Sequence, residues 1–318
     1  MNKIEFGDCR DTMRKWAADG VRVQTCVTSP PYFGLRDYGH DGQIGLEQTP
    51  DEYVAKLVEV FRCVRDVLAD DGTVWLNLGD SYVAPNGRSS TGKSYDNGPN
   101  SQMKHMGDAQ NAGIKRQWGD LPAKNLIGIP WRVAFALQAD GWYLRQDIIW
   151  HKPNPMPESV RDRCTKAHEY IFLLSKSERY YFDSEAMKEP ATHAGKVVKN
   201  NNGKNGQMGE YGATRGGFLK EEGVLVGETR NRRSVWTVTT KPYKGAHFAT
   251  FPPDLIEPCV LAGSRAGDTV LDPFMGSGTT AAVAVKHGRK YLGCELNPAY
   301  KTLQDERIGV SKPTDLFL

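Results

Sequence analysis

The stretch Val27–Gly39, VTSPPYFGLRDYG, places two consecutive prolines directly after a predicted strand, between Ser29 and Tyr32. Proline has no backbone N–H and a fixed φ angle, so the interior of a strand normally avoids it. A proline pair at a strand end supplies rigid carbonyl groups, and the tyrosine beside it supplies an aromatic face. The pattern therefore indicates a site that needs rigid, unpaired carbonyls and a flat ring. A plain turn after a strand is the alternative interpretation.

A glycine-rich turn near the other end of the chain could hold a cofactor. Gly276–Ala281, GSGTTA, matches the pattern G-x-G-x-x-G/A, with a predicted strand before it and a predicted helix after it. Glu295 follows at the end of the next predicted strand, where an acidic residue can bind the two hydroxyls of a ribose. Together these features predict a cofactor that carries adenosine.

Asp272 indicates which cofactor this is. It lies at the strand tip just before the glycines, where a carboxylate would repel the pyrophosphate of NAD. The same charge would attract the α-ammonium group of S-adenosylmethionine. A helix-capping role for Asp272, and with it a dinucleotide-dependent oxidoreductase, is the open alternative.

The elements that must position these residues alternate between strands and helices. Short apolar segments such as 23–29, 73–80 and 268–274 are predicted strands, and Thr49–Glu52 is a capping box that begins a helix. Alternation of this kind predicts an α/β fold with a parallel sheet and helices on both faces. Residues 169–176 and 179–183 are predicted to form an antiparallel strand pair.

Two segments rich in Gly, Asn and Ser interrupt this regularity. Residues 82–121 are predicted to be a long loop or lid, and residues 185–235 an insertion that is either a solvated loop or a target-recognition module. The predicted organisation is therefore a catalytic domain in two parts, 1–184 and 236–318, separated by the 185–235 insertion.

The bulk composition is that of an ordinary globular protein. The 318 residues are 39% hydrophobic and 25% charged, with a net charge of +3, which neither requires nor excludes nucleic acid. The six cysteines form no C-x-x-C pair, so neither a metal site nor a disulfide framework is predicted. No apolar run reaches the roughly 20 residues of a membrane span, and no signal peptide is recognisable. A cytoplasmic protein without membrane contact is expected.

The motifs TSPPY, DPFMGSGTT and GCELNP resemble those of the DNA amino-methyltransferases, which methylate exocyclic nitrogens of bases. The catalytic motif comes first and the cofactor motif last, an order that resembles the circularly permuted β group. The resemblance covers most of the chain and is weakest in the two Gly/Asn-rich segments. It implies a Rossmann-like, mostly parallel seven-stranded sheet and S-adenosylmethionine as the cofactor.

The resemblance also implies roles for particular residues. Glu295 matches the ribose-binding acid, Asp8 a position near the adenine, and residues 247–258 the segment that closes the methionine pocket. The cofactor-binding residues that it implies are Asp8, Phe248, Thr250, Asp272, Pro273, Phe274, Gly276, Ser277, Gly278, Thr279 and Glu295.

The chemistry implied by the resemblance explains the proline pair. An exocyclic amine is a poor nucleophile because its lone pair is delocalised into the ring. Acceptors from Ser29 and Pro30 would bind the hydrogens of the amine and free that lone pair, which is electrostatic preorganisation. Tyr32, and with it Phe33, would stack on a base flipped out of the duplex. The implied catalytic residues are Ser29, Pro30, Pro31 and Tyr32.

Serine in the first position of the motif resembles the cytosine-N4 enzymes and predicts that base. Adenine-N6 methylation stays open, because adenine N1 and cytosine N3 are both acceptors, and so does a non-catalytic nucleic-acid binder. Cys259 follows a proline, as the nucleophile of carbon-5 enzymes does, but it lies in an apolar helical run and is predicted to be a core residue.

The expected partner is double-stranded DNA. A homodimer, such as relatives in the group often form, and a cognate restriction endonuclease are compatible with the resemblance. The predicted DNA-binding residues are Lys152, Arg215, Arg230, Arg232 and Arg233, which can contact phosphates or guanine edges.

Overall fold

The computed structural model describes residues 1–35, 39–40, 42–83, 121–198, 224–240 and 251–310. They form two compact units, Met1–Asp183 with Ser234–Leu318, and Ser184–Arg233. The first unit contains the elements β1 (Lys3–Phe6), α1 (Cys9–Ala18), β2 (Val23–Thr28), α2 (Pro50–Val67), β3 (Leu68–Leu78), α4 (Ile129–Ala139), β4 (Tyr143–His151), β5 (His168–Ser175), β10 (Val235–Thr237), α5 (Pro253–Gly263), β11 (Thr269–Asp272), α6 (Thr279–Lys286), β12 (Lys290–Glu295), η3 (Pro298–Tyr300) and α7 (Lys301–Val310).

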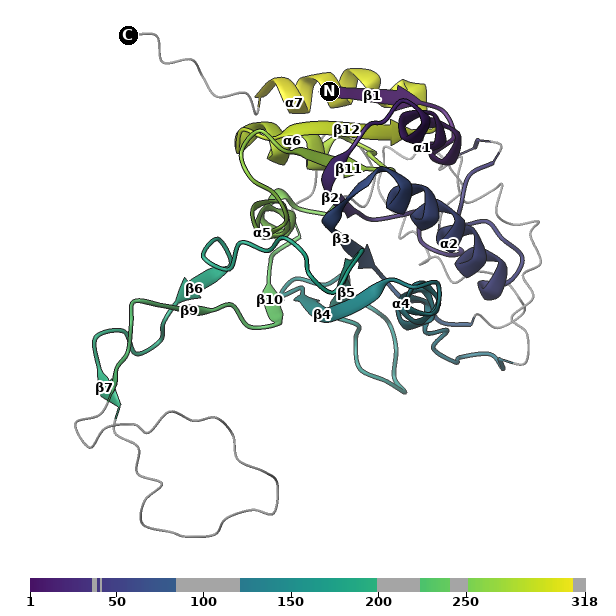
Figure 1. Cartoon of the computed structure of the whole chain (residues 1–318). Helices are drawn as coiled ribbons and strands as arrows, with labels where there is room; N and C mark the ends of the chain where they lie inside the picture. The colour runs from purple at the N-terminus through teal and green to yellow at the C-terminus, as the bar shows by residue number, and fades with distance from the viewer. Residues whose placement is uncertain (36–38, 41, 84–120, 199–223, 241–250, 311–318) are drawn as a thin grey trace. The chain divides into compact units, whose positions relative to one another are not determined.

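One sheet organises this unit, with the strand order β1-β12-β11-β2-β3-β5-β4-β10 (Figure 1). The strands from β1 to β3 are parallel, β5 is antiparallel to both β3 and β4, and β10 is parallel to β4. Helices α1, α2 and α4 pack side by side on one face, and α5, α6 and α7 on the other (Figure 1). The predicted α/β class is therefore confirmed.

Two details of the predicted sheet were wrong. The sheet has eight strands rather than seven, because the short strand β10 is added at the β4 edge. Residues 179–183 form no strand, and β5 pairs with β3 and β4 instead. The backbone N–H of Tyr181 donates to the carbonyl of Asp71 at 2.8 Å. This hydrogen bond holds the segment against β3, but the two do not pair as strands.

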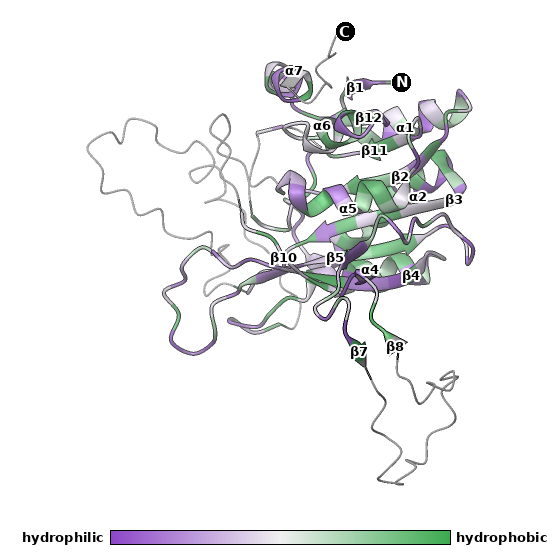
Figure 2. Ribbon diagram, turned by 90° about the vertical axis from the view of Figure 1, so that its left-hand side faces the viewer, coloured by the Kyte–Doolittle hydropathy of each residue, from purple (hydrophilic) through white to green (hydrophobic). Residues whose placement is uncertain are grey.

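The core follows from the sequence pattern of these elements. Every residue of β11 is buried, as is expected for a parallel strand that is covered on both faces. Figure 2 shows hydrophobic residues concentrated in the central strands. Helix α2 begins at the predicted capping box, in which the N–H of Glu52 donates to Thr49 Oγ1 at 3.1 Å. Of the described helices, none has the length and hydropathy to cross a bilayer.

The second unit, Ser184–Arg233, is built from two short antiparallel ladders in its described part. Strand β6 (Lys188–Pro190) pairs with β9 (Thr229–Asn231), and β7 (Val197–Val198) pairs with β8 (Val224–Leu225). Two side chains of the predicted DNA-binding set, Arg230 and Arg233, both donate to the carboxylate of Glu189, at 2.9 and 3.2 Å.

Candidate active site

The two motifs singled out in the sequence follow neighbouring strands. Strands β2 and β11 are parallel and pair through Thr25 with Val270 and Cys26 with Leu271. The segment Ser29–Tyr32 leaves the end of β2, and the glycine-rich turn leaves the end of β11. Since parallel strands end at the same edge of a sheet, both motifs lie at one edge, where α/β folds bind their ligands.

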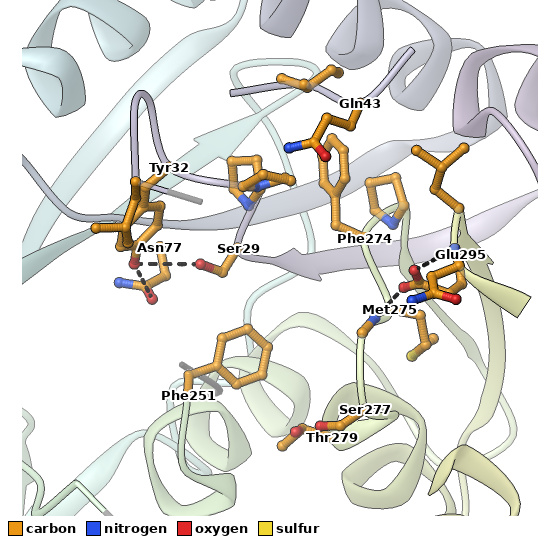
Figure 3. Close-up of a pocket in the computed structure, with 18 of the residues that line it drawn as sticks. Ser29, Tyr32, Gln43, Asn77, Phe251, Phe274, Met275, Ser277, Thr279 and Glu295 are labelled. Carbon is orange, nitrogen blue, oxygen red and sulfur yellow. Dashed lines mark hydrogen bonds between the residues drawn. The ribbon is translucent and has the colours of Figure 1, made fainter. Parts of the chain in front are cut away.

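A pocket of about 620 Å³ opens between the two motifs. Figure 3 shows Ser29, Tyr32 and Asn77 along one side of it and Phe274, Met275 and Glu295 along another, with Phe251 pointing in from the segment that precedes α5. The pocket is lined by all four predicted catalytic residues and by seven of the predicted cofactor-binding residues, namely Asp8, Pro273, Phe274, Gly276, Ser277, Thr279 and Glu295.

Asp272 joins the two motifs and is not part of the pocket wall, contrary to the predicted contact with an ammonium group. Its side chain is 1% exposed. One carboxyl oxygen accepts from Thr28 Oγ1 at 2.6 Å and from the N–H of Phe274 at 3.0 Å, and the other accepts from Thr280 Oγ1 at 2.7 Å. The helix-capping alternative is not borne out either, because the N-cap of α6 is Gly278 and no side chain caps that helix. Burial raises the pKa of Asp272 to about 6, although these three hydrogen bonds lower it.

The glycine-rich turn is held in place by α7. Gln304 Nε2 donates to the carbonyl of Gly276 at 2.7 Å, and Arg307 donates to Ser277 Oγ. Gly278, with a φ of +85°, is the N-cap of α6 and is not among the pocket-lining residues. The left-handed backbone conformation favours glycine at 278, and a Cβ there would lie 3.4 Å from Gln304 Cα of α7.

Glu295 lies at the end of β12 on the cofactor side of the pocket. Its two carboxyl oxygens accept from the N–H groups of Gly276 and Asn297, both at 2.8 Å. Burial raises the pKa of Glu295, and the backbone hydrogen bonds oppose that rise. Each carboxyl oxygen keeps a further lone pair that can accept from a hydroxyl group. The carboxylate and the ring of Phe274 therefore fit the ribose and the base of an adenosine.

Asp8 lines the same side of the pocket and begins α1. Its carboxylate accepts from the N–H of Arg10 at 2.8 Å and from the guanidinium of Arg10 at 2.6 Å. The Arg10 side chain lowers the pKa of Asp8, so this carboxylate stays charged at neutral pH. The structure gives Asp8 a capping role in addition to its place in the pocket.

We expect Glu295→Gln to weaken S-adenosylmethionine binding about 10-fold, because the amide NH₂ of glutamine would face a backbone N–H. Since the pKa of Glu295 is raised, wild-type affinity should also fall as the pH is lowered from neutral toward the acidic range in which this carboxyl gains a proton, while the variant should show less of this dependence. Isothermal titration calorimetry at neutral and at acidic pH measures this. Glu257→Gln is the matched control, because Glu257 pairs with Lys286 away from the pocket. Equal affinities for the wild type and Glu295→Gln would contradict the assignment.

The catalytic side of the pocket is built around the hydroxyl of Tyr32. This hydroxyl donates to Glu169 Oε2 at 2.7 Å, lies 3.2 Å from Asn77 Oδ1, and accepts from Ser29 Oγ at 3.4 Å. Burial and the charge of Glu169 raise the pKa of Tyr32 well above its usual value, so the phenol stays protonated. The ring packs on Gly79, where a Cβ would lie 2.6 Å from Tyr32 Cε2.

The carbonyl groups of the two prolines differ. The Pro31 carbonyl accepts from the hydroxyl of Tyr53 at 2.9 Å. Among the described residues, no group donates to the carbonyl of Pro30, which lines the pocket. Phe33 is 3% exposed and packs against Tyr53 with ring centroids 5.5 Å apart, so the prediction that it stacks on a base was wrong.

Lys152 lies in the wall of the pocket, beside Tyr32. Its ammonium group forms an ion pair with Glu169 and lies 4.2 Å from the ring centroid of Trp150. The Lys152 side chain is 19% exposed, which favours a contact with a group inside the pocket over the predicted contact with a phosphate. An ammonium group desolvated on an aromatic face and paired with one carboxylate keeps further N–H donors available.

Asn77, Trp150 and Glu169 are among the pocket residues that were not foreseen from the sequence. The sequence could have indicated Asn77, because it is a polar residue within the apolar strand 74–78 and a buried amide needs hydrogen-bond partners. Its Nδ2 donates to Glu169 at 3.2 Å and to the carbonyl of Tyr170 at 3.0 Å. Phe248, Thr250 and Arg215 lie outside the described residues, as does most of the predicted lid 82–121.

The fold and this site define a class of enzyme, and comparison with known proteins identifies it. A family model for DNA methylases of the N6/N4 type matches residues 23–306, and the chain belongs to this family. It is therefore an S-adenosylmethionine-dependent DNA methyltransferase of the N4/N6 class. The oxidoreductase and the non-catalytic binder considered above are thereby excluded.

Particular relatives are close in sequence. The type II methyltransferase M.SmaI of Serratia marcescens is 48% identical over 306 residues, which cover 96% of this chain and 90% of that protein. M.Cfr9I of Citrobacter freundii is 46% identical over 302 residues, 95% of this chain and 86% of the relative. These relatives place the chain among methyltransferases of type II restriction-modification.

Solved structures share the Rossmann-like methyltransferase fold. The PvuII DNA methyltransferase, described as cytosine-N4-specific, superposes with a TM-score of 0.60 at 17% identity, over 99% of this chain and 88% of the other. The complex of the Thermus thermophilus protein TTHA0409 with S-adenosyl-L-methionine gives a TM-score of 0.57 at 22% identity, over 99% and 96% of the two chains.

Proposed function

We propose that this enzyme transfers the methyl group of S-adenosylmethionine to the exocyclic N4 amine of a cytosine that has been flipped out of double-stranded DNA. The observation that carries the proposal is that one pocket of about 620 Å³ is lined both by Ser29–Tyr32 and by the cofactor turn after β11. A methyl group can pass between the two motifs only if they share such a pocket.

The catalytic motif activates the amine through acceptors in fixed positions. Pro30 offers a carbonyl to which no described residue donates, and Ser29 offers a hydroxyl that is tied loosely to Tyr32. Acceptors on the hydrogens of the amine direct its lone pair toward the cofactor side of the pocket. S-adenosylmethionine, when bound, supplies an electrophilic methyl group there. No covalent bond between the enzyme and the DNA is required, and electrostatic preorganisation supplies the rate enhancement.

The neighbours of Tyr32 support cytosine as the target base. Tyr32 supplies the stacking face, and Glu169 holds its hydroxyl. Lys152 adds a cationic donor beside that face. Cytosine carries the carbonyl oxygen O2 next to N3, whereas adenine carries a C–H group next to N1. A cationic donor that faces this edge of the base can bind O2 and therefore favours cytosine. The name of the PvuII enzyme and the serine of SPPY agree with this choice.

We further propose that the unit Ser184–Arg233 recognises the DNA sequence. Arg230, in β9, and Arg233, which follows that strand, share Glu189 as an ion-pair partner, and this carboxylate orients both guanidinium groups. Guanidinium groups in fixed positions can bind guanine edges or phosphates, and Arg232 and Arg215 belong to the same proposed set. A homodimer, a cognate restriction endonuclease as functional partner and a cytoplasmic location complete the proposal.

Analysis of methylated nucleosides tests the target base. The purified protein is incubated with genomic DNA and S-adenosylmethionine labelled in its methyl group, and the DNA is digested to nucleosides and separated. We expect the label in N4-methyldeoxycytidine; label in N6-methyldeoxyadenosine would replace cytosine with adenine. Cys259→Ala should leave the labelled product unchanged, since Cys259 is fully buried in α5 and is no nucleophile. Sequencing the product for modified bases gives the recognition site.

A further inference from the structure

Met156 is the most exposed large hydrophobic side chain among the described residues, with 85% of its surface in water. It belongs to the connection between β4 and β5, and it lines the outer part of the pocket next to Asn154 and Pro155. An apolar side chain kept in water at the rim of a binding pocket contributes nothing to the core. A single exposed hydrophobic side chain is common on protein surfaces, so the place of Met156 in the wall of the pocket, and not its exposure alone, points to a partner.

The segment that carries Met156 is held in place at both ends. The amide side chain of Asn154 forms two hydrogen bonds with the backbone of Thr240, from Nδ2 to the carbonyl at 3.2 Å and from the Thr240 N–H to Oδ1 at 3.1 Å. Prolines at 155 and 157 restrict the backbone on both sides of the methionine. The exposed side chain therefore projects from a constrained backbone.

The charges around Met156 suit a nucleic-acid partner. On the C-terminal side of the loop, Glu158 accepts from Arg163 at 2.6 Å and from the N–H of Lys166, which fixes the loop to its own base. Arg161 is exposed, and within the described residues it forms no ion pair. A cation in such a position can bind a phosphate group of a duplex whose bases meet Met156.

We propose that Met156 is a wedge that enters the base stack and fills the space vacated by the flipped nucleotide. The inference rests on the proposed function, because it requires a base to leave the duplex for this pocket. Extrusion of a base costs unstacking free energy, and apolar side chains inserted between base steps offset that cost in other DNA-bending proteins. Methionine suits the task because its flexible, polarisable side chain adapts to the faces of different bases.

The test compares Met156→Ala and Met156→Leu on two DNA substrates. One duplex carries the methylation site fully paired, and the other carries the same site with the target base mismatched, so that it is already partly unstacked. We expect Met156→Ala to lower kcat/KM about 10-fold on the paired duplex and less than about 3-fold on the mismatched one. Met156→Leu keeps an apolar side chain of similar volume and should stay close to the wild type on both.

Fluorescence of 2-aminopurine at the target position supplies a second readout that does not depend on catalysis. The wild type and Met156→Leu should increase the emission on binding, and Met156→Ala should increase it less. An equal loss of kcat/KM on both duplexes, or no loss on either, would overturn the wedge while the proposed function stands. No methylation of either duplex by the wild type would overturn the proposed function, and the wedge with it.

Discussion

Asp272→Asn should lower methyl-transfer activity about 100-fold and the free energy of unfolding by about 3 kcal/mol. The carboxylate accepts three hydrogen bonds, from Thr28, Thr280 and the N–H of Phe274. Asparagine keeps one acceptor and turns its NH₂ group toward the hydroxyl of Thr280, which then loses its 2.7 Å hydrogen bond and is left with the longer contact to the carbonyl of Val27, at 3.3 Å. Because Thr28 precedes the catalytic motif and Thr280 follows the cofactor turn, the substitution also loosens the alignment of the two motifs. Denaturant unfolding and steady-state kinetics measure the two effects.

The pH dependence of the same variant gives an independent check. Burial raises the pKa of Asp272 in the folded protein to about 6, above its ordinary 3.8. The folded protein therefore holds this proton more tightly than the unfolded chain, and the resulting stability is lost as the pH rises through about 6. Asparagine does not titrate. The difference in unfolding free energy between the wild type and Asp272→Asn should thus grow by roughly 1 kcal/mol when the pH is lowered from 7 to 5.

Asp268→Asn is the matched control for this prediction. Asp268 precedes the same strand, but in the described part of the chain its carboxylate accepts only from the N–H of Arg265, at 2.7 Å, in an exposed turn. Its loss should cost less than about 1 kcal/mol and leave activity unchanged. An Asp272→Asn protein as stable and as active as Asp268→Asn would contradict the role given to Asp272.

Tyr32→Ala should lower kcat/KM about 100-fold, and Tyr32→Phe about 10-fold. The alanine variant loses the stacking face and opens the space beside Gly79, where the tyrosine ring is in close contact. The phenylalanine variant keeps the ring and loses the hydroxyl, with its hydrogen bond to Glu169 at 2.7 Å and its weaker contacts with Asn77 at 3.2 Å and Ser29 at 3.4 Å. Methylation kinetics measure the effects, and circular dichroism checks that both variants are folded. If the two substitutions were equally damaging, the hydroxyl and not the ring would carry the role of Tyr32.

The sequence predicted the parts of the fold that depend on local pattern. The capping box of α2 and the strand-turn-helix around Gly276 follow from residues close together in the chain. The prediction that the two motifs face one pocket depended on two further facts. Parallel strands end at the same edge of a sheet, and the order of the motifs is that of the family.

What could not be predicted depends on contacts between distant segments. The carboxylate of Asp272 faces Thr28 rather than the pocket because the sheet places β2 beside β11, although the two residues are 244 positions apart in the sequence. Likewise, Glu169 reaches Asn77 because β5 enters the sheet next to β3, with a direction that no local pattern encodes. The aromatic residues of segment 179–183 favour a strand, but β5 already pairs with β3 on one side and with β4 on the other, so no edge of β5 is left for it.

The reversed direction of β5 has a consequence for engineering the enzyme. His151, the last residue of β4, pairs with His168, the first residue of β5, so the intervening residues form a hairpin connection whose two ends are fixed in register. Lys152 and Glu169 directly follow these two paired residues, and the N–H of Lys152 donates to the carbonyl of Ala167 at 2.8 Å, which fixes the base of the connection. We therefore expect that the middle of this connection can be exchanged for one of another length or composition. Such an exchange would change the contacts with the DNA while the residues that carry out methyl transfer stay in place.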